Sequence, residues 1–174
     1  MTPIASLAPT LQALADFPRL LGAHYAAIPD GFAQWSPAAW DGIPSERFTP
    51  LEQALHVRDI ERLGYHVRLS RTRDEENPLL ADIDSYELAD QRGYTQATSH
   101  DGAQALEDFA AARAQTVAML HALTEKQLAR PAVFEGLGPV TLRGLVHLLC
   151  SHDQQHLAGL QWLLARIDAQ RLAA

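Results

Sequence analysis

The chain has 174 residues, 47% hydrophobic and 20% charged, so it is long enough to bury a core and too apolar to be disordered. Its 14 Lys and Arg residues against 21 Asp and Glu give a net charge of −7, which argues against nucleic-acid binding, because that depends on basic residues that neutralise phosphates. The single cysteine, Cys150, excludes an internal disulfide, and without a signal-peptide-like start or a membrane-spanning apolar stretch we expect a cytoplasmic protein that binds no membrane.

Alanine and leucine dominate the sequence, and apolar residues recur every three or four positions. Alternating runs of Val, Ile and Thr are absent, so the pattern predicts an all-α fold. The first helix is predicted from about Ser6 to Ala27. The connection that follows, residues 28–49, contains helix breakers but also aromatic side chains, so we expect it to pack against the protein.

The second helix is predicted to begin at Thr49-Pro50, where Thr49 is a good N-cap and Glu52 completes a capping box. It should end near Arg73. Its expected inward stripe consists of His56, Ile60, Leu63 and Val67.

The third helix is predicted from about Gly102 to Ala122, after a polar stretch with short helical turns. A short helix at 124–128 and a loop over 131–139 should precede the fourth helix, from Thr141 to about Ala169. Four long amphipathic helices predict a single domain over 1–174, a four-helix bundle with extra short helices in its connections. The long connections leave the topology open.

Two histidines, His152 and His156, lie four residues apart in the apolar stripe of the fourth helix and therefore on one helix face. His56 lies in the inward stripe of the second helix. Burying a bare imidazole would cost on the order of 1–3 kcal/mol, so these rings need partners. If the two helices are neighbours, the three rings converge as in bundle metal sites, with a coordination position left open. The alternative is three hydrogen-bonded core histidines.

Acidic residues flank the histidines. Asp59, three residues after His56, is the candidate catalytic residue: it could orient an imidazole or act as a base toward a metal-bound water. Glu61 is rotated away from that face and is expected on the helix surface or as an inter-helix partner. Asp153 flanks the histidine pair and could contact the histidines as an outer partner of the metal site. For all three, a solvated helix face is an equally good interpretation.

The chain resembles the DinB-like superfamily, specifically its metal-dependent-hydrolase and bacillithiol-transferase-like branch. The matching segments are Phe48 to Glu61, Asp90 to Tyr94 and Leu137 to His156. The family's His-x-x-Asp-x-Glu and His-x-x-x-His motifs correspond to His56, Asp59, Glu61, His152 and His156. Phe48 stands where the family usually has Trp.

The resemblance implies an up-down-down-up bundle, a divalent metal (often zinc or nickel) held by His56, His152 and His156, and a homodimer. We therefore expect a metal-dependent enzyme for a small-molecule substrate, without DNA chemistry. It would transfer a low-molecular-weight thiol, as co-substrate, to an electrophile, or hydrolyse a small substrate. The alternative is a non-catalytic bundle that binds a metal or another ligand.

Overall fold

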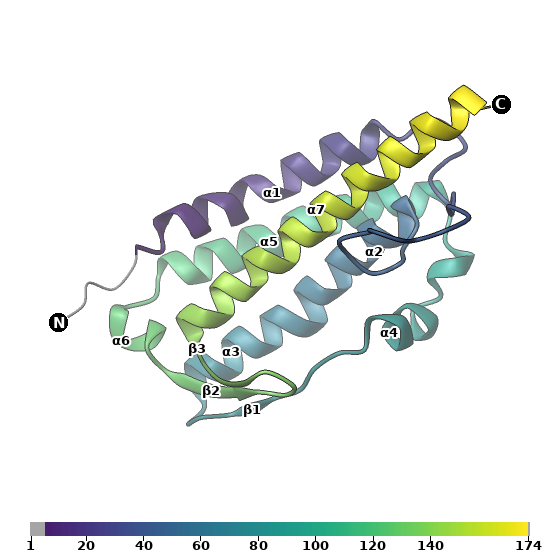
Figure 1. The fold of residues 1–174 in the computed structure, drawn as a ribbon. Coiled ribbons are helices and arrows are strands. Elements are labelled where there is room, and N and C mark those ends of the chain that lie inside the picture. Colours follow the sequence, from purple (N-terminus) through teal and green to yellow (C-terminus); the bar gives the residue numbers. More distant parts are fainter. Residues whose placement is uncertain (1–5, 174) are drawn as a thin grey trace.

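The three-and-four spacing of apolar residues produces four long helical segments in the computed structural model, which describes residues 6–173. They are α1 (Ala8–Ala26), a continuous segment from Pro50 to Asp74, α5 (Ser99–His121) and α7 (Leu142–Ala173). In Figure 1, α1 and α7 run in one direction and the other two segments run in the opposite direction. The up-down-down-up four-helix bundle is confirmed. Within the described residues, no helix combines the length and apolar character that crossing a membrane requires.

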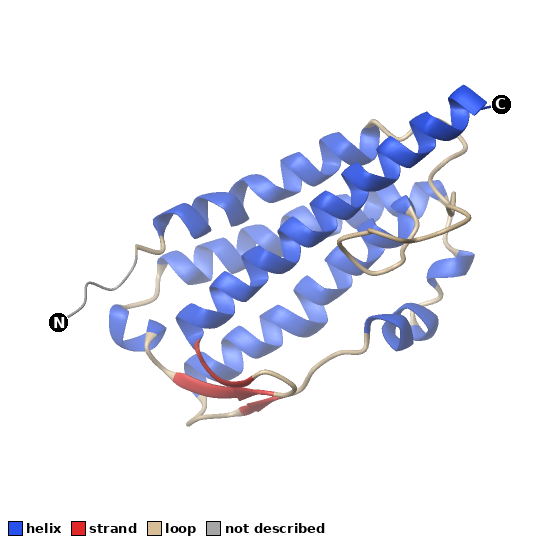
Figure 2. Cartoon of the chain, viewed as in Figure 1, coloured by secondary structure: helices blue, strands red, loops and turns tan. Residues whose placement is uncertain are grey.

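Short elements occupy the connections. Three of them are helices, as expected: α4 (Ser85–Gln91), η2 (Tyr94–Gln96) and α6 (Glu125–Leu128). The others form a small sheet in the order β1-β2-β3, from β1 (Leu79–Leu80), β2 (Pro131–Phe134) and β3 (Gly138–Thr141). Figure 2 shows this sheet at the end of the bundle where α7 begins.

The prediction of a loop over 131–139 was wrong, because β2 and β3 pair there as an antiparallel hairpin. Gly136 and Gly138 adopt φ values of 77° and 94°, which suit glycine and let the chain reverse. Strands of two to four residues are too short to show an alternating pattern, so periodicity could not reveal them.

The predicted helix starts are close to the observed ones. Thr49 caps α2 with the expected capping box, in which the Glu52 side chain accepts from the Thr49 backbone N–H at 2.8 Å. The helix α5 begins three residues earlier than predicted because Thr98 is its N-cap, and the Asp101 side chain accepts from the Thr98 backbone N–H.

The inward stripe of the second segment was only half right, because the segment is not a regular α-helix. It comprises α2 (Pro50–Asp59), the π-helix η1 (Ile60–Tyr65) and α3 (His66–Asp74). A π-turn spans one residue more than an α-turn and rotates every later side chain. Leu63 and Val67, predicted inward, are therefore 45% and 48% exposed, and the buried positions are instead Gly64, Tyr65, Arg68, Leu69 and Thr72.

The connection 27–49 packs against the bundle as expected. Trp40 stacks on Trp162 of α7, with ring centroids 6.2 Å apart and planes inclined by 16°. The backbone N–H of Leu51 donates to the Ala33 carbonyl at 2.8 Å. Together, these two contacts hold the connection against α7 and α2.

Candidate metal centre

Three imidazoles from two distant segments converge inside the bundle. His56 projects from α2, and His152 and His156 project from α7; His56 and His156 are fully buried and His152 is partly buried. The Nε2 atom of His152 lies 3.4 Å from Nε2 of His56 and 3.1 Å from Nε2 of His156. The structure thus brings together the three residues expected as ligands, because α2 and α7 are neighbours.

Gln53 determines which nitrogen of His156 is free. Its side-chain Nε2 donates to the Ser45 hydroxyl at 2.8 Å and to the carbonyls of Glu46 and Phe48 at 3.3 Å. Because two of these acceptors are carbonyls, the amide oxygen must face the other way, where it lies 2.5 Å from Nδ1 of His156. Nδ1 therefore carries the proton, and the lone pair on Nε2 points toward the other two histidines.

The geometry and the chemistry of this donor set fit a divalent cation. Ligands at about 2.0–2.1 Å from a tetrahedral zinc are separated by about 3.3 Å, close to the observed 3.1 and 3.4 Å. Facing Nε2 atoms cannot all donate to one another, so a shared cation is the simplest partner for their lone pairs. The Nδ1 atoms of His56 and His152, which a cation at Nε2 would not contact, are buried and have no partner among the described residues.

The rings are uncharged at neutral pH. Burial lowers the pKa of His56 to about 4, although Glu46 and Asp59 act in the opposite direction. Burial, assisted by His56 and two arginines, lowers the pKa of His152 to about 3. The pKa of His156 also lies well below its ordinary value, chiefly because the ring is buried. Neutral imidazole is the form that binds metals, so the site is ready for a cation.

Glu46, in the connection before α2, lies beside the histidines. Its Oε2 is 3.4 Å from Nε2 of His156, and its Oε1 is 3.9 Å from Nε2 of His56. The Ser85 hydroxyl donates to Oε1 at 2.7 Å. Sequence reasoning missed this residue because an irregular connection has no periodicity that would aim a side chain. Gln53 was also missed, although it lies three residues before His56 and hence on the same helix face.

The carboxylate of Asp59 forms its hydrogen bonds with residues other than the three histidines. It accepts two hydrogen bonds from Arg58 at 2.8 and 2.9 Å, two from Arg92 at 3.2 and 3.5 Å and one from the Tyr94 hydroxyl at 3.0 Å. Among the described residues, no imidazole nitrogen forms a hydrogen bond or ion pair with it. The role of Asp59 in proton transfer stays a prediction. Its contacts show that Asp59 links α2 to the residues between α4 and η2.

Glu61 and Asp153 share one buried partner, Arg113 of α5. The guanidinium donates to Glu61 at 3.0 and 2.9 Å and to Asp153 at 2.6 and 3.0 Å. Glu61 is thus the inter-helix partner that the sequence allowed. Despite Arg113, burial raises the pKa of Asp153 to about 7. No sequence pattern identified Arg113, because arginine is usually expected at the surface even when its neighbours on the helix are apolar.

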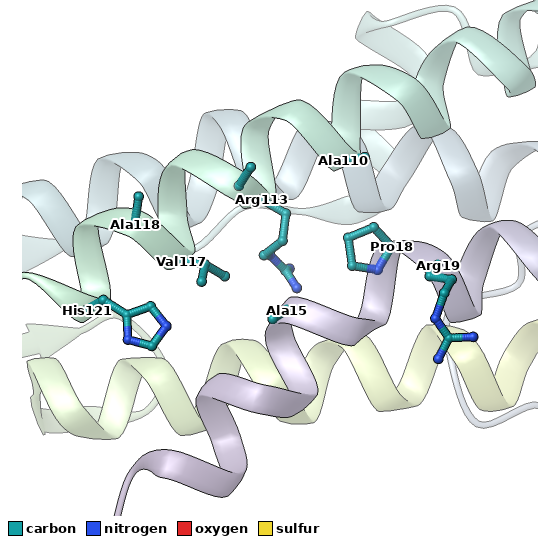
Figure 3. Close-up of a pocket in the computed structure, with 9 residues that line it drawn as sticks. Ala15, Pro18, Arg19, Ala110, Arg113, Val117, Ala118 and His121 are labelled. Carbon is teal, nitrogen blue, oxygen red and sulfur yellow. The ribbon is translucent and has the colours of Figure 1, made fainter.

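A cavity of about 700 Å³ runs between α1 and α5, and none of the described residues that line it is one of the three histidines. Figure 3 shows Arg113 extending from α5 toward α1 at this cavity, and its Nη1 donates to the Leu14 carbonyl at 3.2 Å. The other lining residues are Ala15, Pro18, Arg19, Ala110, Ala114, Val117, Ala118 and His121.

Comparison with known proteins agrees with this architecture. No curated protein matches the chain. A similar solved structure is YfiT from Bacillus subtilis, described as a probable metal-dependent hydrolase with an unusual four-helix bundle topology; the TM-score is 0.82 at 19% identity, over 97% of this chain and 92% of that one. Such identity shows a shared fold. The family model of the DinB superfamily matches residues 13–160, most of the chain, so the protein belongs to the DinB superfamily.

Proposed function

We propose that this protein is a metal-dependent enzyme that uses His56, His152 and His156 to hold one divalent cation and acts on a small molecule. The observation that carries the proposal is the convergence of three imidazole nitrogens, from α2 and α7, within 4.8 Å of one another. Nitrogen donors of this kind suit zinc or nickel. Three protein ligands leave a coordination position for a further group, which is typical of reactive metal sites.

The chain's own residues supply binding and orientation. Gln53 holds the His156 ring, and burial keeps all three imidazoles neutral and available as donors. A divalent cation bound there supplies Lewis acidity, which favours the deprotonated form of a water or thiol beside it. Glu46 and the partly buried His152 mark the side of the centre that solvent reaches, since the Glu46 side chain is 27% exposed.

Hydrolysis of a small substrate is the first reaction to test, because YfiT, which shares the fold, is described as a probable metal-dependent hydrolase. Transfer of a low-molecular-weight thiol to an electrophile is the second candidate. It is supported by the three imidazole donors, because zinc held by imidazoles also accepts a thiolate sulfur. A screen of ester and amide hydrolysis beside thiol conjugation would separate the two reactions.

Metal content tests the proposal directly. We expect about one equivalent of metal per chain in the parent protein and strong loss in His56→Ala and His152→Ala, because each substitution removes one of three ligands. Replacing the exposed His121 by alanine is the matched control and should leave the metal content unchanged. Equal metal content in all four proteins would reject the centre.

Chelation separates the enzyme from a non-catalytic bundle with a structural metal. A catalytic centre should release its metal while the bundle keeps its helical circular dichroism. Unfolding on chelation would instead indicate a metal that holds the fold together.

A further inference from the structure

We propose that Glu46 is a fourth protein donor to the cation, delivered to the three histidines by the connection 27–49. This inference rests on the proposed metal centre. The Glu46 Oε2 atom is 3.4 Å from His156 Nε2, the same separation as between the Nε2 atoms of His56 and His152. A carboxylate oxygen at the spacing of neighbouring ligands needs only a small side-chain rotation to share their cation.

The charge of Glu46 distinguishes it from the other acidic side chains around the histidines. Asp59, Glu61 and Asp153 each form an ion pair with an arginine, Arg113 being shared by the last two. Glu46 pairs with no lysine or arginine in the described part of the chain; besides the Ser85 hydroxyl, its oxygens face the nitrogens of His56 and His156. A partly buried carboxylate beside uncharged rings lacks a positive partner, and a cation among those rings would provide one.

Hydrogen bonds hold both the backbone and the side chain of Glu46 in this position. Gln53 accepts from His156 through its amide oxygen and donates to the Glu46 carbonyl and the Ser45 hydroxyl through its amide nitrogen. One side chain therefore sets the distance between a histidine ligand and the backbone of Glu46. The Ser85 hydroxyl binds Oε1, which leaves Oε2 as the oxygen nearest to His156.

Gly159 allows the connection 27–49 to approach α7 closely. It lies three residues after His156 on α7, and a Cβ atom there would overlap the Ser45 hydroxyl. The connection can thus lie directly on α7 beside the histidines. A carboxylate donor would lower the net charge of the centre from about +2 to about +1, and zinc can still accept a fifth ligand, so a substrate position remains.

Cobalt binding tests the inference without a substrate. Metal-free protein would be titrated with Co²⁺ against a colorimetric chelator, and the visible spectrum recorded for the parent, Glu46→Gln and Glu46→Asp. We expect Glu46→Gln to raise the Kd for Co²⁺ at least about tenfold and to change the spectrum, because an anionic oxygen donor is lost. Glu46→Asp keeps the charge but is one methylene shorter, so it should also bind more weakly and show an altered spectrum.

The matched control is Glu76→Gln, which removes the same charge from an exposed turn after α3 and should match the parent. Identical affinity and spectrum in Glu46→Gln and the parent would overturn the inference. A purely electrostatic role would appear as weaker binding in Glu46→Gln with parent-like binding in Glu46→Asp, which also overturns it. If the parent itself binds no Co²⁺, the proposed metal centre fails, which is a different result. Circular dichroism would confirm that each variant is folded.

Discussion

Arg113 of α5 holds Asp153, the residue next to His152, through hydrogen bonds of 2.6 and 3.0 Å. The same guanidinium binds Glu61, five residues after His56. One buried arginine therefore ties together the two segments that carry the histidines. The buried charged network around Arg113 therefore adjoins the uncharged group of imidazoles.

Replacing Arg113 by methionine should lower the free energy of unfolding by about 3–5 kcal/mol, because two buried carboxylates would lose their partner. Urea denaturation of the metal-free protein measures this. The control is Arg62→Met, since Arg62 is 52% exposed and lies 3.7 Å from Asp108; its effect should stay below about 1 kcal/mol. Similar losses in the two variants would contradict a special role for the buried network.

Asp59→Asn should lower the free energy of unfolding by about 1–3 kcal/mol at neutral pH, since it removes the negative charge that accepts five hydrogen bonds. Burial alone would raise the pKa of Asp59, but Arg58, Arg92 and Tyr94 outweigh it and hold the pKa below 3.8. The unfolded chain therefore takes up this proton more readily. The stabilisation by Asp59 is complete above pH 3.8 and is lost as the pH falls through the lower folded-state pKa.

The difference between parent and Asp59→Asn should accordingly shrink in denaturation curves recorded below pH 3.8. Asp74→Asn is a matched control, because Arg73 and Asp74 form the same pairing of neighbouring residues on an exposed surface; it should have little effect. If Asp59→Asn kept full stability and lost only catalysis, Asp59 would be the proton carrier that its spacing from His56 first indicated.

Gln53→Leu should weaken metal binding about 10–100-fold, because the Nδ1–H of His156 loses the acceptor that orients the ring. Gln53→Glu retains an acceptor and should bind metal more tightly than Gln53→Leu. Competition with a chelator measures both. Gln34, in the connection before α2, offers a control, since its amide donates to the Ala97 carbonyl, and Gln34→Leu should leave the affinity unchanged. Equal affinity in Gln53→Leu and the parent would show that the ring is positioned by packing alone.

Gly159→Ala should weaken metal binding, because the new methyl group would displace Ser45 and with it the Gln53 contacts. The control is Gly144→Ala in the same helix, where the added Cβ would lie 3.5 Å from the Thr141 hydroxyl, an ordinary contact. This control should stabilise the protein by up to about 1 kcal/mol through helix propensity, without changing metal affinity. Thermal unfolding and metal competition of both variants provide the comparison, and parallel behaviour would contradict the steric argument.

Much of the fold followed from periodicity. The apolar stripe of α7 continued through the histidines without a break, and the observed burial of Leu149, His156 and Leu160 agrees with it. The stripe of α2 placed His56 correctly, because the helix is regular up to Asp59. Register within one regular helix is a local property, and for that reason a single sequence can reveal it.

The remaining features depend on contacts between distant residues. Glu46 reaches the histidines only because the connection 27–49 folds back on α7, and Arg113 is buried only because Glu61 and Asp153 meet it from two other segments. Neither contact leaves a pattern along the chain. The two-residue strand β1 likewise forms only by pairing with β2, more than fifty residues later.

The π-helix η1 makes the length of the second segment matter as much as its composition. A π-turn holds one residue more than an α-turn, so deleting a single residue between Ile60 and Tyr65 would restore an ordinary α-turn and leave Arg68, Leu69 and Thr72 on the face that is buried now. Forcing the unshortened segment into a regular α-helix would instead rotate everything downstream by about 100° and bring Leu63 and Val67 inward. One residue of length at this point is therefore equivalent to one step of register for the whole of α3.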